Sequence, residues 1–472
     1  MAEEAWHEAR LIPTSGISGA EEQERRATSA LLAVLTAVKE FGRGLTQPLG
    51  APAGTIETFI EVPFALGDKR LYPDGLIRVR RANKTWTALV EVKTGTNELE
   101  PAQLENYLDI AREQAYDCLI TISNQIPPAA GQHPTAVDKR KLKKVALHHY
   151  SWSQVLAEAV MQKEHRGVAD PDQAWILSEL IRYLEHPKSG ALEFDDMGAS
   201  WVPVRDAVAA GTLRPSDKGV ADVAARFDAL LRFVSLRLGR TLGTEIVPVV
   251  SRKELADPAL RSAALIDSLV KDERLSGALR IPNAVAPLNI ELDLRSGRIT
   301  CHIDLDAPKE GRPNTRVNWL VRQLKNAPDA LRIEAYAAHA RGGSAASLLK
   351  DVRLDPAVLV QDPKKELRSF RLALTGPLGT KRGRGRGAAI DSVLAAVDTY
   401  YGEVLQHLKA WTATPPKMRE PAEAPVDTAP ALVSTALSSQ DGVQEAVEAP
   451  TLSEPAALTP VAAEDGVEKP VG

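Results

Sequence analysis

The sequence predicts a mixed α/β fold, α+β overall: a compact mixed sheet flanked by helices, then a helical segment and an α+β C-terminal domain. Three observations lead to this expectation. Alternating or β-branched segments occur beside segments with apolar residues at helical spacing. The length of 472 residues exceeds that of one ordinary domain. A hydrophobic fraction of 44% with 25% charged residues is typical of soluble globular proteins.

The first domain is expected over residues 20–165, after a short lead at 1–19. Residues 20–42 predict a helix because apolar residues recur at helical spacing behind an acidic start. A second helix is expected to begin at Pro101, where a missing N–H costs nothing. The strand-like segments are TIETFIEVPFAL, LIRVRR, WTALVEVK and DCLITISN. The resulting order, α-β-β-β-α-β, predicts one sheet with helices packed on it.

The second domain is expected over residues 170–412 and is harder to interpret. Its clearest helical segments are DQAWILSELIRYLEH, ADVAARFDALLRFVSLRLGRTLG, RVNWLVRQLKNA and AAIDSVLAAVDTYYGEVLQHLKAW. Its clearest strands flank the turn RSG in PLNIELDLRSGRITCHIDL, followed by LRIEAYAAH and LRSFRLALTG. No motif in this domain indicates a chemistry, so we expect it to select the substrate or a protein partner; the oligomeric state is left open.

The chain is expected to end in a disordered acidic tail, residues 413–472, which has no aromatic residue. Ten acidic and three basic residues give this tail a net charge of −7, which leaves +3 for the body out of the chain's −4. A slightly basic body is compatible with nucleic-acid binding. The polar start, the two distant cysteines and the absence of a long apolar run indicate a cytoplasmic protein without a membrane partner.

Residues 72–95, YPDGLIRVRRANKTWTALVEVKTG, carry the pattern that indicates a chemistry. Side chains alternate along a strand, so Glu91 and Lys93 are expected on one face. If the two segments pair as a hairpin, Asp74 is level with that end, and two carboxylates and an ammonium converge. Mg²⁺ (or Mn²⁺) takes hard oxygen ligands, so we expect Asp74, Glu91 and the backbone carbonyl of Val92 to bind it.

Such a metal would make a bound water a better nucleophile and would stabilise charge on a phosphodiester, with Lys93 steadying the transition state. Asp74 after Pro73, followed by Glu91-Val92-Lys93 on the next strand, resembles the PD-(D/E)xK nuclease signature. Downstream, the QLENY segment places a glutamine and a tyrosine four residues apart on one helix face. This pair, Gln103 and Tyr107, is similar to the QxxxY element of RecB-like members of that superfamily.

The resemblance covers residues 20–150 and implies a restriction-endonuclease-like fold. It implies metal-dependent cleavage of phosphodiester bonds, usually of DNA, in repair, restriction or defence. It also implies an acidic residue on the upstream helix. Glu24 is preferred because it shares a face with the apolar stripe, and Glu21 and Glu22 are the alternates.

A second candidate site is the glycine-rich segment TKRGRGRG, whose cations suit phosphates of any sequence: Lys381, Arg382, Arg384 and Arg386. The alternative is a solvated, flexible loop. His148 and His149 are adjacent on a strand and therefore face opposite sides, so we interpret them as structural.

Two other functions stay open. The first is a nuclease fold without catalysis that binds DNA or a protein partner; the complete triplet of Asp74, Glu91 and Lys93 argues against it. The second is a stress-response scaffold in which Pro-Asp-Gly is only a turn and Glu-Val-Lys is ordinary strand alternation. Convergence of the two carboxylates, with Lys93 on the same face, distinguishes the metal site from the scaffold.

Overall fold

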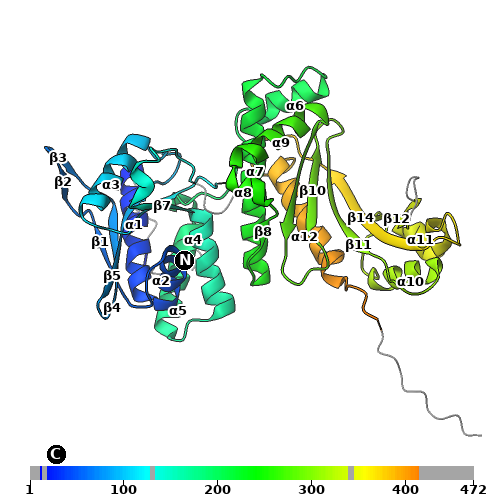
Figure 1. Cartoon of the computed structure of the whole chain (residues 1–472), viewed down its shortest axis with the longest axis horizontal. Coiled ribbons are helices and arrows are strands. Elements are labelled where there is room, and N and C mark those ends of the chain that lie inside the picture. Colours follow the sequence, from blue (N-terminus) through cyan, green and yellow to red (C-terminus); the bar gives the residue numbers. More distant parts are fainter. Residues whose placement is uncertain (1–10, 13–18, 128–132, 339–344, 414–472) are drawn as a thin grey trace, which may run out of the picture. The chain divides into compact units, whose positions relative to one another are not determined.

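The computed structural model describes the chain in four ranges, namely residues 11–12, 19–127, 133–338 and 345–413 (Figure 1). These ranges contain helices and three sheets with mixed strand orientations, so the expected mixed α+β class is confirmed. Most of the expected lead (1–19) and all but the first residue of the expected tail (413–472) lie outside the described residues. No helix in the described ranges is long and apolar enough to cross a membrane.

The first part of the chain is built on a five-stranded sheet with the order β1-β4-β5-β6-β7. Its strands are β1 (Thr55–Ile60), β4 (Gly75–Arg81), β5 (Lys84–Val92), β6 (Cys118–Ser123) and β7 (Ala146–Ser151). β1, β4 and β5 are antiparallel, whereas β5, β6 and β7 are parallel. The central strand β5 therefore has an antiparallel neighbour on one side and a parallel neighbour on the other.

Helices cover both faces of this sheet. They are α1 (Ala20–Ala37), α2 (Lys39–Thr46), α3 (Pro101–Glu113), α4 (Trp152–Val160) and α5 (Pro171–Glu185). Each face of the sheet has its own apolar core, and alternate residues of β5 point into one or the other. Val90 packs in the core formed with α1, α2, α4 and α5, and Leu89 packs in the core formed with α3. Helix α5, which the sequence interpretation grouped with the second domain, thus buries residues such as Leu180 in the first core.

Two local features differ from the expected elements. The single helix expected over 20–42 is broken at Val38, which is fully buried in an extended conformation with φ −105° and ψ 93°. The segment expected as one strand, TIETFIEVPFAL, is divided at Glu61, whose φ is 49°. Its second half forms a separate hairpin of β2 (Phe64–Leu66) and β3 (Lys69–Leu71).

The second part is built on a seven-stranded antiparallel sheet with the order β13-β12-β14-β11-β10-β9-β8. Its strands are β8 (Val247–Pro248), β9 (Arg274–Arg280), β10 (Leu288–Asp293), β11 (Arg298–Asp306), β12 (Arg332–Ala337), β13 (Ala345–Leu348) and β14 (Leu367–Pro377). The hairpin expected around RSG is present as β10–β11.

Six helices in the described residues of this part share one apolar core with the sheet. They are α6 (Trp201–Ala209), α7 (Lys218–Leu242), α9 (Pro258–Lys271), α10 (Pro313–Gln323), α11 (Leu349–Leu354) and α12 (Ala389–Glu403). The short helix α8 (Arg252–Ala256) has no buried residue. Helix α7 packs against α9 and β9, and it also packs against α4 of the first part. The buried hydroxyl of Tyr400 on α12 donates to the carbonyl of Leu372 at 2.7 Å, which fixes that helix on the sheet.

Candidate functional site

The β4–β5 hairpin brings Asp74 level with Glu91. Gly75 pairs with Val90 across the hairpin, so the next residue on each strand, Asp74 and Glu91, lies opposite its counterpart. The backbone N–H of Val92 donates to Oδ2 of Asp74 at 2.7 Å and fixes this carboxylate at the end of the strand pair. The sequence separation of the two acidic residues therefore matches the register of the hairpin.

Glu91 is a buried carboxylate with unusually few partners. Its relative exposure is 1%, and within the described residues neither carboxylate oxygen accepts a hydrogen bond of good geometry. The ammonium of Lys93 lies 2.8 Å from Oε1 and forms an ion pair. Burying a carboxylate is costly unless it is paired, so this position favours cations, of which Lys93 is one.

Burial and the close approach of charged side chains shift the pKa values of the site. Burial, together with the nearby charge of Asp74, raises the pKa of Glu91 to about 8. The pKa of Asp74 is also raised, mainly by burial, although the Val92 N–H and Lys93 oppose the change. Burial alone would lower the pKa of Lys93, but Glu91 and the other carboxylates outweigh it and raise this pKa above its ordinary value. Lys93 is thus a cation, and a pKa of about 8 means that the protonated form of Glu91 predominates at pH 7.

Glu24 on α1 also reaches the site. Its Oε2 lies 3.4 Å from Nζ of Lys93, and its side chain is 15% exposed. Asn97, in the loop after β5, donates to the other oxygen at 2.5 Å. The two alternates on α1 pair with arginines, Glu21 with Arg25 and Glu22 with Arg26, although Glu21 lines the same cavity as Glu24 and Asp74.

Gln103 and Tyr107 on α3 act on the peptide that precedes Asp74. The amide of Gln103 donates to the hydroxyl of Tyr107 at 3.2 Å, and that hydroxyl donates to the backbone carbonyl of Tyr72, also at 3.2 Å. Burial and then Glu91 raise the pKa of Tyr107 to about 12, so its hydroxyl keeps its proton. This pair therefore positions the turn that carries Asp74.

The residues fit a divalent cation in part. Asp74 and Glu91 offer hard oxygens, and the observation that favours a metal is the buried Oε2 of Glu91, which has no hydrogen bond within the described residues. However, no group of three or more His, Cys, Asp or Glu side chains within the described ranges is arranged to hold an ion. A metal would have to complete its shell with water and backbone oxygen, for which the carbonyl of Val92 is the candidate. Mg²⁺ commonly keeps several waters.

A row of polar residues continues from Glu91 across the sheet. Thr121 is in register with Glu91 on β6, and His149 is in register with Thr121 on β7. The hydroxyl of Thr121 lies 2.9 Å from Nδ1 of His149 and 2.8 Å from Nε2 of His133. Burial lowers the pKa of His149 to about 4, so it is neutral and holds the loop after β6 through the carbonyl of Gln125.

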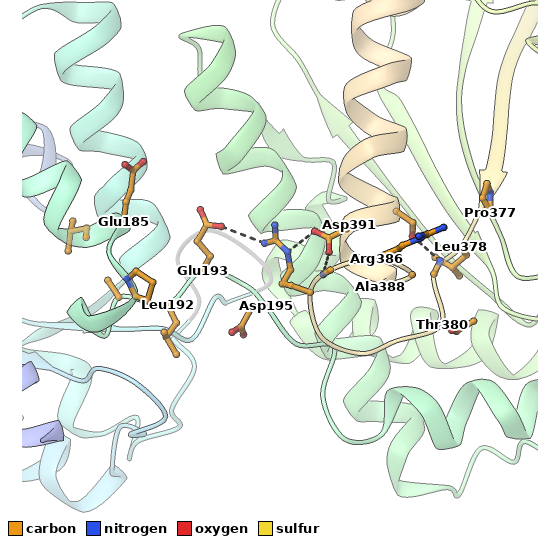
Figure 2. Close-up of a pocket in the computed structure, with 18 residues that line it drawn as sticks. Glu185, Leu192, Glu193, Asp195, Pro377, Leu378, Thr380, Arg386, Ala388 and Asp391 are labelled. Atoms are coloured by element: carbon orange, nitrogen blue, oxygen red, sulfur yellow. Dashed lines mark hydrogen bonds and ion pairs between the residues drawn. The ribbon is translucent and has the colours of Figure 1, made fainter. Parts of the chain in front are cut away.

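The basic loop lies between β14 and α12. Two of its cations are held by carboxylates: Arg384 pairs with Asp391 at 2.7 Å and with Glu193 at 3.5 Å, and Arg382 pairs with Asp196 at 3.4 Å. Figure 2 shows the ion pairs that reach Glu193 and Asp391 at the edge of a cavity of about 1150 Å³.

The backbone of the loop is also fixed. The N–H of Lys381 donates to the carbonyl of Gly387 at 3.0 Å. Gly385 and Gly387 have φ values of 102° and 81°, which favour glycine. The side chains of Lys381 and Arg386 make no ion pair or hydrogen bond in the described part of the chain, so these two cations are available to a polyanion.

No model of a protein family, no curated protein and no solved structure matches this chain.

Three contacts of the site escape sequence reasoning. Asn97 lies in a polar loop and has no spacing that marks it. Trp152, at the start of α4, donates from Nε1 to the carbonyl of Lys93 at 2.9 Å. The carbonyl of Tyr72 is an acceptor that any residue could provide. The capping pair Ser151 and Gln154 does mark the start of α4 and could have drawn attention to Trp152.

Proposed function

We propose that this protein is a metal-dependent nuclease that hydrolyses phosphodiester bonds, with DNA as the expected substrate. One observation supports this most strongly. Asp74 and the buried carboxylate of Glu91, whose one charged partner is Lys93 at 2.8 Å among the described residues, converge beside that ammonium. The raised pKa of Glu91 shows that its ionised form is costly to bury. Strongly perturbed carboxyls of this kind are frequent at functional sites, and the oxygens of this one suit a cation.

The residues of the chain have separable roles in this proposal. Mg²⁺ or Mn²⁺, when bound by Asp74 and Glu91, supplies a nucleophile near neutral pH and stabilises charge on the phosphodiester. Lys93 provides a fixed positive charge for the oxygen on which negative charge develops. Glu24 holds the ammonium of Lys93 from the other side, and Tyr107 keeps the Asp74 turn in place.

Substrate binding is proposed to use the surface beside this site. Tyr72 is 49% exposed, and the guanidinium of Arg70 lies 5.6 Å from its ring centroid. A second such pair joins Arg78 to Phe59, again at 5.6 Å. Exposed aromatic rings with adjacent arginines suit stacked bases and phosphates. Lys381 and Arg386 are the proposed non-specific contacts of the second part.

The direct test is incubation of purified protein with linear duplex, nicked duplex and single-stranded DNA and with RNA, in Mg²⁺, Mn²⁺ or EDTA. We expect cleavage that requires the metal and is lost in Asp74→Ala and Glu91→Ala. Asp68→Ala, which removes an exposed carboxylate from the β2–β3 turn, is the matched control and should retain activity. Absence of both cleavage and metal binding in the wild type would remove the proposal.

A second candidate is a nuclease fold that binds nucleic acid without cutting it. The observation that favours it is the ion pair between Lys93 and Glu91, since an ammonium 2.8 Å away already compensates the buried carboxylate. This candidate predicts binding of DNA that is unaffected by EDTA and by Glu91→Gln.

A further inference from the structure

A second cavity lies where α7 packs against α4, and it is separate from the Asp74–Glu91 site. Its volume is about 660 Å³, within the range of roughly 300–1,000 Å³ that small-molecule sites occupy. One stripe of α7 lines it with Arg232, Ser235 and Gly239, and α4 lines it with Gln154 and Glu158. Beside the cavity, His165 in the π-helical segment Met161–Arg166 that follows α4 contacts α7, with its Nε2 2.8 Å from the carbonyl of Arg240.

Arg232 is the unusual residue of this cavity. It is 8% exposed, yet within the described part of the chain its guanidinium has no hydrogen bond and no ion pair. Burial lowers its pKa and only the charge of Glu245 opposes this, but a guanidinium stays protonated in proteins. Arg232 lines the cavity, and no described residue accepts a hydrogen bond from its guanidinium, so its N–H donors are available to a ligand there.

The side chains that line the cavity around Arg232 carry a net positive charge. Four arginines and two glutamates line the cavity. Arg166 pairs with Glu158 at 2.5 Å, and Arg240 pairs with Glu193 at 3.5 Å. Arg232 and the exposed Arg43 make no ion pair within the described residues, so the cavity attracts an anion. Apolar residues provide the remaining wall, among them Leu45, Pro48 and Ile246.

We propose that this cavity binds a small phosphate-bearing molecule whose phosphate group pairs with Arg232. Phosphate suits a planar guanidinium because two parallel N–H···O bonds can form. The volume and the apolar wall leave room for an organic part of nucleotide size. This site is independent of the nuclease proposal, because it shares no residue with the Asp74–Glu91 site.

The experiment is calorimetric titration of the full-length protein with inorganic phosphate and with adenosine monophosphate, at constant ionic strength set by chloride. We expect saturable binding. Tighter binding of the nucleotide would identify an organic phosphate as the ligand, and equal or weaker binding would identify free phosphate. Binding of neither probe would overturn the proposal.

Three variants locate the binding. Arg232→Met should weaken it roughly tenfold to a hundredfold, because a charged hydrogen-bonding pair is lost. Arg226→Met, the same change at an exposed position of α7, should leave the affinity unchanged. Glu245→Gln removes the competing carboxylate from an exposed position and should strengthen binding about threefold.

The last variant keeps the test decisive even if Arg232→Met fails to fold. The proposal would be overturned if Glu245→Gln bound the anion no more tightly than the wild type. It would also be overturned if a folded Arg232→Met kept full affinity, because the anion would then bind elsewhere. The cleavage assay is a separate readout, so a failure here does not affect the conclusion about nuclease activity.

Discussion

The ammonium of Lys93 lies 2.8 Å from the carboxylate of Glu91 and 3.4 Å from that of Glu24, so one cation joins α1 to β5 at the end of the sheet. A divalent ion bound at Glu91 would have to share this carboxylate with Lys93. The two cations repel each other, so the lysine should moderate metal affinity while it contributes to transition-state stabilisation.

Removal of this charge separates the two effects. In Lys93→Met we expect Mg²⁺ affinity to be retained or increased, because the competing ammonium is gone and both carboxylates remain. The cleavage rate should fall on the order of 10²–10³-fold, as is typical for loss of one such stabilising group. Calorimetric Mg²⁺ titration beside a cleavage assay measures both. Loss of metal binding in this variant would show that Lys93 instead maintains the carboxylate geometry.

The pKa of Glu91 makes stability depend on pH. Its folded value of about 8 lies above the ordinary 4.5, so the folded state holds a proton that the unfolded state loses between these values. Unfolding then releases the proton, and the free energy of unfolding falls as pH rises from about 4.5 to 8. In EDTA we expect the melting temperature of the wild type to decrease across this window and that of Glu91→Gln to decrease less.

The same proton competes with the metal. Apparent Mg²⁺ affinity should rise by up to about tenfold per pH unit below the pKa of Glu91 and level off above it. At pH 8 the apo form of Glu91→Gln should be more stable than the wild type, and added Mg²⁺ should stabilise only the wild type. A wild-type melting temperature that is flat between pH 5 and pH 8 in EDTA would contradict the raised pKa.

Tyr107→Phe tests the link between α3 and the Asp74 turn. The change removes one hydroxyl that donates to the carbonyl of Tyr72, which should cost about 1 kcal/mol of stability. Mg²⁺ affinity should fall as well, because the turn that carries Asp74 loses a constraint. Tyr116→Phe is the control, since this tyrosine packs its ring against Phe64 and its hydroxyl has no hydrogen bond in the described ranges. Equal effects of the two variants would argue against a positioning role.

The ion pairs divide the basic loop into two functional classes. Lys381→Ser and Arg386→Ser should each weaken nucleic-acid binding alike for all sequences and reduce the salt slope by about one, without a change in melting temperature. Arg384→Ser should lower the melting temperature instead, because Arg384 connects Asp391 to Glu193. Filter binding at several salt concentrations and thermal melts separate the two classes. The loop is only a connector if the first pair of variants binds like the wild type.

Deletion of residues 414–472 should leave the melting temperature nearly unchanged, because a segment without aromatic residues has little to bury. The deletion also removes a net charge of −7, so binding to polyanions should strengthen or stay level. Differential scanning calorimetry and DNA binding of the truncated protein measure both effects. A large drop in melting temperature would show that this segment packs on the body.

The sequence predicts the Asp74–Glu91 arrangement well because the arrangement is local. Alternation along β4 and β5 and a short connection determine the register, so Asp74 can be placed opposite Glu91 without knowledge of the rest of the fold. The preference for Glu24 over Glu21 follows in the same way from helical periodicity, and the structure brings Glu24 to Lys93. Metal binding and cleavage stay predictions.

Features that depend on distant contacts could not be predicted. β9 was missed because Gly277 and several charges weaken its strand signal. In the fold, a side chain at Gly277 would collide with Leu231, whose Cδ1 lies 2.2 Å from the position of an added Cβ, so the glycine permits close packing of α7 on the sheet. The break at Val38 was missed as well, because apolar periodicity continues through this residue and predicts an uninterrupted helix, whereas its backbone is extended.

The mixed pairing of β5 also has a consequence for the kinetics of folding. Its antiparallel partner β4 directly precedes it across a short turn, and such hairpins close within about 1–10 μs, whereas pairing with β6 must wait for the α3 crossover. We therefore expect Asp74 and Glu91 to meet early, in a solvated hairpin, and to be buried only when α3 docks. The barrier of this later step should grow as pH rises and Glu91 ionises, while hairpin closure stays nearly independent of pH. Stopped-flow refolding at pH 5 and pH 8 would then differ in its slow phase alone.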